Sequence, residues 1–549
     1  MNKYLSIVFI AFLISNSSNA QGLLGDKQEV FTRQDTLRGS ITKERAWWDV
    51  KYYHLEIKVN PADSTITGSN TIRYQVLTKS NRMQIDLQEP LKISKVIQDG
   101  KELKYQRDAS VFYIDLVVPQ NPGEIKELIV FYGGKPKIAV NPPWDGGITW
   151  KKDANGKPFI ASSCQGLGAS VWWPNKDHMY DEVDDMLISV NVPKNLTDVS
   201  NGRLQSVIDL KDGTRTFNWY ISNPINNYGV NINIGDYVSF SEVYKGENGD
   251  LDCDYYVLRD NLEKAKIQFK EVPRMLKAFE NWFGPYPFYD DGYKLVEAPY
   301  LGMEHQSSVT YGNGYQNGYL GKDRSGSGWG SKFDYIIIHE SGHEWFANNI
   351  TYKDIADMWI HESFTTYSEN LFVEYYFGKE AGAEYVRGQR KGIQNKKQMI
   401  GKYDVNREGA DLYNKGANML HTLRQIVNDD EKWRTILRGL NSTFYHQTVT
   451  TKQIEDYISQ KVGLDLAPFF GQYLRDIRIP TFEYKFKGNT LWYRWTNCVP
   501  GFTIPVKVTL NGKEQWLKPQ AEWTNLPQSA KDLKVEVDNN FYVNVINNN

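Results

Sequence analysis

One short motif constrains the fold of this chain more than any other feature. Within Phe333–Asn349, the residues His339, Glu340 and His343 form the pattern H-E-x-x-H. On an α-helix, positions four residues apart share one face, so the two imidazoles can bind one zinc ion from the same side. Glu340 would then lie beside the ion, where a general base for a water molecule is needed. The alternative is a core helix that happens to carry two histidines.

The spacing to a second helix predicts the third ligand. A helical pattern begins near Asp357 and continues to Phe377. If this helix packs antiparallel against the first, a residue in its first turn faces the metal, and Glu362 fits that position. Two His and one Glu, with the fourth position open, make the ligand set of a catalytic zinc site. We therefore predict one Zn²⁺ per chain, bound by His339, His343 and Glu362.

Other polar residues near the motif receive weaker interpretations. Glu369 lies two helical turns after the third ligand, so it either accepts a hydrogen bond from a ligating imidazole or is a solvated carboxylate. His361 faces about 100° away from its neighbouring ligand and is expected in packing or on the surface. Glu344 likewise faces elsewhere. Phe346 and Asn349 occupy positions where metzincins need Gly and His, which excludes that class of site.

These residues resemble the zinc signature of the aminopeptidase N family (peptidase family M1, gluzincin metallopeptidases). The family patterns H-E-x-x-H-x-W-F-x-N and E-x-F match residues 339–348 and 362–364. Gly342 is unusual inside a helix, although a small residue is usual there in the family. The resemblance implies a zinc-dependent aminopeptidase in which Glu340 is the general base. The chain resembles a three-domain form that lacks the large helical C-terminal domain of many relatives.

An upstream segment extends the resemblance. The family has G-x-M-E-N about 35 residues before its first zinc ligand, and this chain has Leu301-Gly-Met-Glu-His305 there. The resemblance implies that Glu304 binds the free α-amino group of a substrate and that Gly302 and Met303 lie along the substrate main chain. A buried carboxylate discriminates against a blocked amino end, because it is then left unpaired. Leu301 and His305 depart from the family pattern, and His305 is a candidate supporting or subsite residue.

Two further assignments rest on the resemblance. Gln165, in Ser163-Cys-Gln165, matches the position from which the family sends a Gln or Glu toward the substrate amine. Without the family it is an ordinary loop amide. Tyr413, in Tyr413-Asn-Lys-Gly416, matches the catalytic tyrosine, whose hydroxyl would donate to the developing oxyanion. Without the family, a tyrosine at a helix start is usually a packing residue.

The pattern of predicted elements divides the chain. Short alternating segments such as His54–Val59 indicate strands, and Asn155-Gly156 indicates a hairpin. Helical spacing follows over Leu262–Phe283 and again over Gln453–Val462, where Thr451 is the expected cap and Gly463 the expected stop. We predict a multidomain fold with an all-β sandwich or saddle domain, a thermolysin-like, mostly helical α+β catalytic domain and a small C-terminal β-sandwich. The predicted boundaries are 1–20 for a signal peptide, then 21–244, 245–478 and 479–549.

The N-terminus predicts export. Lys3 precedes the apolar run Tyr4–Ile14, and small polar residues follow up to Ala20. This is the pattern of a secretory signal peptide cut after Ala20. The run is too short to span a bilayer, and no cysteine follows it to carry a lipid. We therefore expect a periplasmic or secreted protein without a membrane anchor.

Composition excludes several functional classes. The 549 residues suggest about three or four domains, and 40% hydrophobic with 24% charged residues is globular. With 64 basic and 66 acidic residues, the net charge of −2 gives no support for nucleic-acid binding. Cys164, Cys253 and Cys498 are far apart and are expected to be buried thiols with at most one disulfide.

The sequence thus predicts an exported zinc aminopeptidase acting on peptides with a free N-terminus. One alternative is a leukotriene-hydrolase-like relative that uses the same site as an epoxide hydrolase and aminopeptidase. A different class is a non-catalytic scaffold that keeps the fold to bind peptides. Retention of Glu340, Glu304 and Tyr413 together argues against the scaffold, because a binder needs none of that set.

Overall fold

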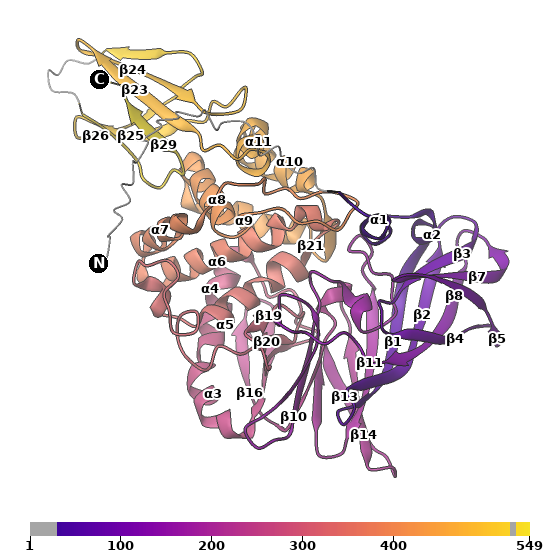
Figure 1. The fold of residues 1–549 in the computed structure, drawn as a ribbon. Coiled ribbons are helices and arrows are strands. Elements are labelled where there is room, and N and C mark those ends of the chain that lie inside the picture. The colour runs from indigo at the N-terminus through magenta and orange to yellow at the C-terminus, as the bar shows by residue number, and fades with distance from the viewer. Residues whose placement is uncertain (1–29, 528–533, 549) are drawn as a thin grey trace, which may run out of the picture.

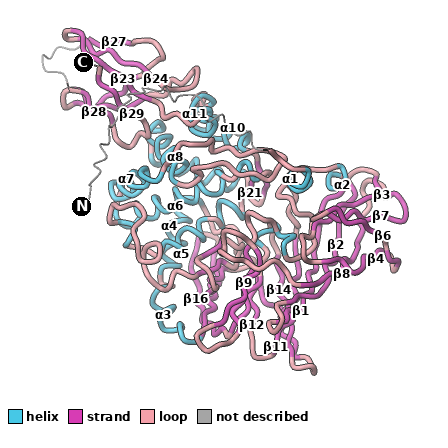
Figure 2. Tube along the Cα trace, in the orientation of Figure 1, coloured by secondary structure: helices cyan, strands magenta, loops and turns pink. Residues whose placement is uncertain are grey.

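Three structural regions follow one another along the chain. The computed structural model describes residues 30–527 and 534–548. N-terminal strands form one end of the molecule, helices fill its middle, and the C-terminal strands lie at the opposite end (Figures 1 and 2). The predicted signal peptide, residues 1–20, lies outside the described residues. Within the described ranges, no helix is long and apolar enough to cross a membrane.

The N-terminal β region is built on an eight-stranded sheet. In β1, Leu55, Ile57 and Val59 are buried while Lys58 between them is exposed, the alternation of a strand with one face on the core. A parallel pairing of β1 with β11 joins the two halves of this sheet. In spatial order the strands are β13 (Arg203–Asp209), β14 (Thr214–Ile221), β11 (Asp185–Pro193), β1 (Trp48–Asn60), β2 (Thr65–Val76), β8 (Ile125–Gly134), β4 (Lys92–Gln98) and β5 (Lys101–Glu102).

Two smaller sheets complete this region. β9 and β10 pair antiparallel around the turn at Asn155-Gly156, which confirms the predicted hairpin. Their sheet has the order β12 (Thr197–Ser200), β15 (Ile232–Gly235), β10 (Pro158–Ser163) and β9 (Gly147–Lys152). The other has the order β3 (Ser80–Asp86), β7 (Val111–Gln120) and β6 (Lys104–Asp108).

The expectation of a purely β N-terminal region was wrong at its beginning. Two short helices, α1 (Arg33–Gly39) and α2 (Lys43–Ala46), precede the first strand. Thr32 and Asp35 form a reciprocal capping box at the start of α1. Helices this short show no 3.6-residue hydrophobic period, so the pattern gave no signal for them.

A five-stranded sheet begins the central region. Its order is β16 (Tyr237–Gly246), β17 (Gly249–Leu258), β18 (Tyr293–Glu297), β20 (Val309–Tyr311) and β19 (Gly302–Met303). β16 crosses the predicted boundary between residues 244 and 245 and pairs with β17 along its full length. β19 is an edge strand and lies against α5 (Tyr335–Gly342), so this sheet edge reaches the metal-ligand helix.

Helices dominate the rest of the central region. The predicted helix over residues 262–283 is interrupted, because Phe269 leaves the helix and packs among aromatic rings, with its ring 5.1 Å from that of Tyr311. Thr450, rather than the predicted Thr451, caps α10, and Gly463 ends it at φ 82°. The helices are α3 (Leu262–Gln268), α4 (Glu271–Phe283), α5, α6 (Trp359–Phe377), α7 (Lys379–Gly388), α8 (Asn414–Val427), α9 (Asp430–Thr443), α10 (Thr451–Val462) and α11 (Ala467–Arg475). A small parallel pair, β21 (Ile350–Tyr352) and β22 (Gln447–Val449), lies beside them.

Strands return after residue 480 in two sheets. One has the order β27 (Thr524–Pro527), β24 (Thr490–Thr496), β23 (Thr481–Lys487) and β29 (Asn544–Asn547). The other has the order β26 (Lys513–Leu517), β25 (Val506–Leu510) and β28 (Val535–Val537). The three cysteines carry free thiols; Cys164 and Cys253 are buried as expected, whereas Cys498 is only partly buried.

Candidate active site

Three ligand atoms of the predicted metal site converge between α5 and α6. Oε2 of Glu362, in the first turn of α6, is 3.7 Å from Nε2 of His339 and 3.6 Å from Nε2 of His343. These atoms all lie within 4.8 Å of one another, and the three side chains are buried. The helices are antiparallel, because His339 contacts Glu369 while His343 contacts Thr365, one turn earlier in α6. The two helices therefore bring the three predicted ligands together.

These atoms fit a zinc ion. Zinc binds nitrogen and carboxylate oxygen at about 2 Å, so one ion can lie between atoms that are 3.6–3.7 Å apart. Oε2 of Glu362 is buried and accepts no hydrogen bond. An unpaired buried carboxylate oxygen is costly, and binding a cation removes that cost.

Both imidazoles are held through their second ring nitrogen. Nδ1 of His339 is 2.7 Å from Oε1 of Glu369, and Nδ1 of His343 is 3.0 Å from the carbonyl oxygen of Phe346. These acceptors hold the proton on Nδ1, which leaves each Nε2 free to bind a metal. Glu369 is fully buried and also accepts a hydrogen bond from the hydroxyl of Tyr385 at 2.6 Å, so it is not a solvated carboxylate.

The metal-ligand helix is shorter than predicted. Helical spacing was expected to extend through His343, but α5 covers only Tyr335–Gly342 and His343 is its C-cap. The backbone is clearly non-helical at Phe346, with φ −129° and ψ 74°. This bend turns the carbonyl of Phe346 back toward His343 and leads into β21. Where a further helical turn would lie, the chain instead bends so that the carbonyl of Phe346 can accept a hydrogen bond from His343.

Gly342 determines how closely α5 and α6 approach. A Cβ at this position would lie 2.6 Å from Oγ of Ser368 and 3.2 Å from Cγ2 of Thr365. Glycine inside a helix costs ~1 kcal/mol relative to alanine. Here the absence of a side chain lets the two ligand-bearing helices pack tightly, which explains the unusual residue.

Glu304 lies at the other end of the site and receives two hydrogen bonds from the N-terminal β region. Nε2 of Gln165 donates to Oε1 of Glu304 at 2.6 Å, and the hydroxyl of Tyr228 donates to the same atom at 3.1 Å. Glu304 is 3% exposed and has no basic partner among the described residues. Burial, together with the charges of Glu340 and Glu362, raises the pKa of Glu304 well above its ordinary range. A cationic group would relieve this cost.

Glu340 lies between Glu304 and the metal ligands. Carboxylate oxygens of Glu304 and Glu340 and a ring nitrogen of His343 lie within 4.8 Å of one another. Burial raises the pKa of Glu340 to about 7. A carboxylate with that pKa is suited to accept and return a proton near neutral pH. Gly302 allows β19 to approach, because a Cβ there would be 2.9 Å from Oε1 of Glu340.

The predicted site residues line one cavity of about 230 Å³, which we call the acidic cavity. It contains carboxylates and no lysine or arginine among its lining residues. Tyr413 is 44% exposed, precedes the first turn of α8, and has its ring centred 6.0 Å from that of His339. The cavity brings together Gln165, Gly302, Met303, Glu304, His339, Glu340, His343, Glu362 and Tyr413, with Pro143, Trp144, Gly166, Met358, Glu408 and Leu412.

Sequence reasoning missed three residues of the site. Tyr228 supports Glu304, and Trp144 and Glu408 line the acidic cavity. Each lies in an irregular segment far from the metal-ligand motif in sequence, so no local pattern marked it. Conversely, His305 is fully buried and does not line the cavity, and burial lowers its pKa to about 3. His361 is also buried, with Nε2 3.0 Å from the backbone N–H of Tyr352.

Comparison with known proteins gives a consistent result. Residues 267–473 match the model of the peptidase family M1 domain. This stretch contains the predicted ligands, Glu304, Glu340 and Tyr413. The chain contains a peptidase family M1 domain. It is accordingly a hydrolase of the metallo-aminopeptidase class, with one zinc ion as its cofactor.

Curated relatives are distant and longer. Leukotriene A-4 hydrolase of Xenopus laevis is 23% identical over 76% of this chain and 70% of its own length. Probable aminopeptidase 1 of Sulfurisphaera tokodaii is 21% identical over 86% of this chain, and rat aminopeptidase B is 25% identical over 67% of it. These alignments span 60% and 54% of the two aminopeptidases, so the M1 chain covers only part of their length.

Solved structures share the fold. An M1 zinc metallopeptidase of Deinococcus radiodurans, bound to a Tyr-Ser-Ala substrate, superimposes with a TM-score of 0.67 at 21% identity, covering 78% of this chain and 95% of that one. Another structure of an M1 zinc metallopeptidase from Deinococcus radiodurans gives a TM-score of 0.64 at 22% identity over 76% of this chain and 90% of the other. The N-terminal β region and the helical catalytic domain are thus those of M1 peptidases.

Proposed function

We propose that this M1 protein is an aminopeptidase that removes single residues from the free amino end of peptides. The observation that carries the proposal is the position of Glu304. It is a buried carboxylate without a basic partner among the described residues, and it lies within 4.8 Å of Glu340 and His343 in the acidic cavity. An ammonium group at Glu304 places the first peptide bond next to the metal ligands. An internal segment of a chain offers no such cation.

Different residues of the acidic cavity bind different parts of the peptide. Gln165 and Tyr228 both donate to Oε1 of Glu304, so they fix its carboxylate toward the bound amine. Gly302 and Met303 form β19, an edge strand whose free backbone groups are available to a substrate main chain. A peptide paired with this strand would be held in register between Glu304 and the metal ligands.

His339, His343 and Glu362 would hold the zinc ion. When bound, zinc supplies Lewis acidity that polarises the scissile carbonyl and acidifies a water molecule. Glu340 accepts the proton of the attacking water on its carboxylate and passes it to the departing amine. The hydroxyl of Tyr413 donates a hydrogen bond to the carbonyl oxygen as negative charge develops there. Every proton transfer is thus assigned to a side chain in the acidic cavity.

A matched pair of substrates tests the proposal. The zinc-loaded protein should cleave leucyl-fluorophore, and N-acetyl-leucyl-fluorophore should be a very poor substrate, because its blocked nitrogen leaves Glu304 unpaired. Removal of zinc with a chelator should abolish the activity, and added zinc should restore it. Equal cleavage of the two substrates would exclude amine recognition and with it the aminopeptidase assignment.

Two other functions remain outcomes of the same experiments. The similarity to leukotriene A-4 hydrolase motivates an assay of epoxide opening, which uses the same metal ligands. Epoxide turnover that exceeds peptide turnover would favour that relative's chemistry. Zinc and peptide binding without any turnover would favour a non-catalytic scaffold.

We further propose that the protein is exported through residues 1–20 and lacks a membrane anchor. The domain limits at residues 244 and 478, a thermolysin-like topology of the catalytic domain and a C-terminal β-sandwich are proposals of the same kind. N-terminal sequencing of the mature protein tests the signal peptide directly. A mature chain that begins at Met1 would contradict export by this route.

A further inference from the structure

His361 is a fully buried histidine to which the mechanism above gives no role. It directly precedes the metal ligand Glu362 in the first turn of α6, and it does not line the acidic cavity. Its ring stacks on that of Tyr352, at the end of β21, with the ring centres 4.1 Å apart. Packing explains the position of the ring but not the polar contacts of its two nitrogens.

The hydrogen bond at one ring nitrogen fixes the proton on the other. The backbone nitrogen of Tyr352 lies 3.0 Å from Nε2 of His361. A backbone amide can only donate, so Nε2 is the acceptor and the single proton of the neutral imidazole is on Nδ1. Nδ1 lies 3.4 Å from the hydroxyl oxygen of Tyr228. His361 is therefore the donor in its contact with Tyr228.

The hydroxyl of Tyr228 passes this direction on to Glu304. Its oxygen accepts from Nδ1 of His361, and its own proton is donated to Oε1 of Glu304 at 3.1 Å. Tyr228 is 2% exposed, so its hydroxyl has these partners in place of bulk water. Backbone amide, imidazole, phenol and carboxylate thus form a chain in which each group has one role. Hydrogen bonds in such a buried chain polarise and strengthen one another.

Tyr228 is held at its backbone as well as at its hydroxyl. It lies in the 3₁₀ turn η2 (Asn227–Gly229), where Oδ1 of Asn226 accepts a hydrogen bond from the N–H of Gly229 at 2.6 Å. This turn belongs to the N-terminal β region, whereas His361 belongs to the segment that matches the M1 domain. The contact of His361 with Tyr228 therefore fixes the phenol across the boundary between the two regions.

The chain also determines which oxygen of Glu304 is left for a ligand. Gln165 and Tyr228 both donate to Oε1, and neither of them occupies Oε2. A carboxylate that is held at one oxygen from two sides presents the other oxygen in a fixed direction. Such a preorganised group binds an ammonium without first losing rotational freedom.

We propose that His361 is a positioning residue for recognition of the substrate amine, and that it acts through the hydroxyl of Tyr228 on Glu304. The inference rests on the proposed aminopeptidase function and adds to it a residue outside the acidic cavity. It requires a side chain at position 361 that donates a proton to the phenol. Acceptance of the backbone proton of Tyr352 is then a separate, structural contribution.

Two substitutions separate positioning from packing. In His361→Gln, Oε1 can take the place of Nε2 and keep the hydrogen bond to Tyr352, but no donor remains near the position of Nδ1. In His361→Asn, Nδ2 can take the place of Nδ1 and keep the donor to Tyr228, but the side chain is too short to reach Tyr352. A purely structural role predicts the greater harm from Asn. The positioning role predicts the greater loss of amine recognition from Gln.

The measured quantity is the ratio of kcat/KM for leucyl-fluorophore to that for N-acetyl-leucyl-fluorophore. We expect His361→Gln to lower this ratio about 3- to 10-fold, the worth of one hydrogen bond, mainly through KM. His361→Asn should keep the wild-type ratio but have a lower free energy of unfolding, because the N–H of Tyr352 is left unpaired. His421→Gln replaces a histidine that is 4% exposed and does not line the acidic cavity, and it should also keep the ratio.

A double-mutant cycle checks the route through Tyr228. Tyr228→Phe lacks the hydroxyl, so adding His361→Gln to it should lower the ratio no further. Additive losses would overturn the proposed route. Bound zinc in His361→Gln, measured by metal analysis, should match the wild type. A loss of zinc that accounts for the fall would assign the effect to the neighbouring ligand Glu362 and overturn the inference.

The remaining outcomes separate this inference from the proposed function. An unchanged ratio in His361→Gln, equal falls in the Gln and Asn variants, or the same fall in His421→Gln would overturn the role of His361. A wild-type preference for the free amine would still support the aminopeptidase in each of these cases. Equal cleavage of the two substrates by the wild type would overturn both. If His361→Gln does not fold, His361→Asn decides, because loss of its ratio would contradict the positioning role.

Discussion

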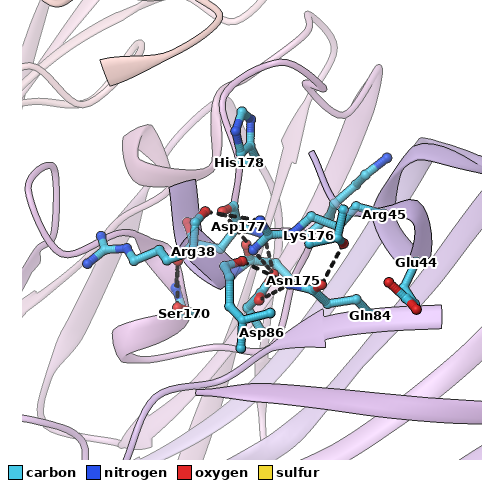
Figure 3. A network of polar contacts seen from close by, with 12 residues as sticks. Arg38, Glu44, Arg45, Gln84, Asp86, Ser170, Asn175, Lys176, Asp177 and His178 are labelled. Atoms are coloured by element: carbon cyan, nitrogen blue, oxygen red, sulfur yellow. Dashed lines mark hydrogen bonds and ion pairs between the residues drawn. The ribbon is translucent and has the colours of Figure 1, made fainter. Parts of the chain in front are cut away.

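Two buried polar clusters in this molecule differ in whether their charged side chains have partners of opposite charge. The first joins the N-terminal helices α1 and α2 to the loop that follows β10, and we call it the paired cluster (Figure 3). It consists of Arg45, Asp86, Lys176, Asp177 and Asp181. The second is the acidic cavity of the active site. Both are withdrawn from water, but only the first supplies its own counter-charges.

Within the paired cluster, four of the five charges form two ion pairs, and Asp177 accepts hydrogen bonds from the backbone N–H and hydroxyl of Ser170. Arg45 and Asp86 form an ion pair at 2.8 Å, and Lys176 pairs with Asp181 at 2.5 Å. The ammonium of Lys176 also lies 4.3 Å from the centre of the Trp48 ring. Because burial of single ions is expensive, such pairing is what a structural role requires.

The carboxylates of the acidic cavity have no basic side chain as a partner. Glu304 and Glu362 accept hydrogen bonds or face imidazoles, but no Lys or Arg lines the cavity. A folded protein tolerates this cost where an external cation removes it. In the acidic cavity, the carboxylates without a basic partner therefore lie where a metal ion and a substrate ammonium would be stabilised.

The largest expected effect is a loss of turnover in Glu340→Gln, with no change in stability. Glu340→Gln should lower kcat for leucyl-fluorophore by about 10²–10⁴-fold, because an amide cannot accept the proton of water. Bound zinc, measured by metal analysis, and the free energy of unfolding should stay at wild-type values. The exposed Glu514→Gln serves as control and should retain full activity. Substantial turnover by Glu340→Gln would assign the proton transfer to another group.

The paired cluster should respond in the opposite sense. Lys176→Met should lower the free energy of unfolding by about 3–5 kcal/mol, because Asp181 is then buried without its partner. The double variant Lys176→Met/Asp181→Leu should recover most of that loss. Urea titration measures both, and kcat per folded molecule should not change. A single variant as stable as wild type would show that the pair contributes no stability.

A third variant, Glu304→Gln, tests the acidic cavity for substrate recognition and for stability. Glu304→Gln should reduce the preference for leucyl- over N-acetyl-leucyl-fluorophore by about 10- to 100-fold, since the charged hydrogen bond to the ammonium is lost. Unlike Lys176→Met, it should not lower the free energy of unfolding, because it removes a buried charge that has no basic partner. An unchanged preference would place amine recognition elsewhere in the cavity.

The smallest effect concerns pH. Burial, together with the charge of Arg45, lowers the pKa of His178 to about 3 from an ordinary value of 6.5. Between these values the unfolded chain binds a proton that the folded protein excludes, so stability is lost as pH falls below 6.5. His178→Gln should reduce this slope by up to about 1.4 kcal/mol per pH unit, measured by urea titration from pH 6.5 to 4.5. The same slope in both proteins would contradict the buried neutral state.

The metal ligands could be predicted because helical geometry is regular. The four-residue spacing of His339 and His343, and an antiparallel partner helix that carries Glu362, leave few arrangements open. The same periodicity placed Glu369 on the side of the ligands but left open whether it supports an imidazole or is solvated, and the structure shows the contact with His339. The resemblance to M1 peptidases then supplied Gln165 and Glu304, which the structure joins by a hydrogen bond at 2.6 Å.

Other features depend on tertiary contacts and were not predictable in this way. α5 ends at Gly342, and the bend that follows brings the carbonyl of Phe346 to Nδ1 of His343, a contact that helix propensity does not predict. Tyr228 reaches Glu304 from a short 3₁₀ turn in the N-terminal β region. This contact joins segments that are far apart in the chain.

The support of Glu304 has a consequence for how such enzymes are divided into modules. Both donors to its Oε1 atom, Gln165 and Tyr228, come from outside the segment that matches the M1 peptidase model, residues 267–473. That segment carries the complete metal-ligand set but only half of the amine recognition. A chimaera with a different N-terminal β region would therefore keep the metal ligands. It would lose the two hydrogen-bond donors that hold Glu304 for the substrate amine. If the proposed function holds, recognition of the peptide N-terminus depends on contacts between the N-terminal β region and the M1 segment rather than on either one alone.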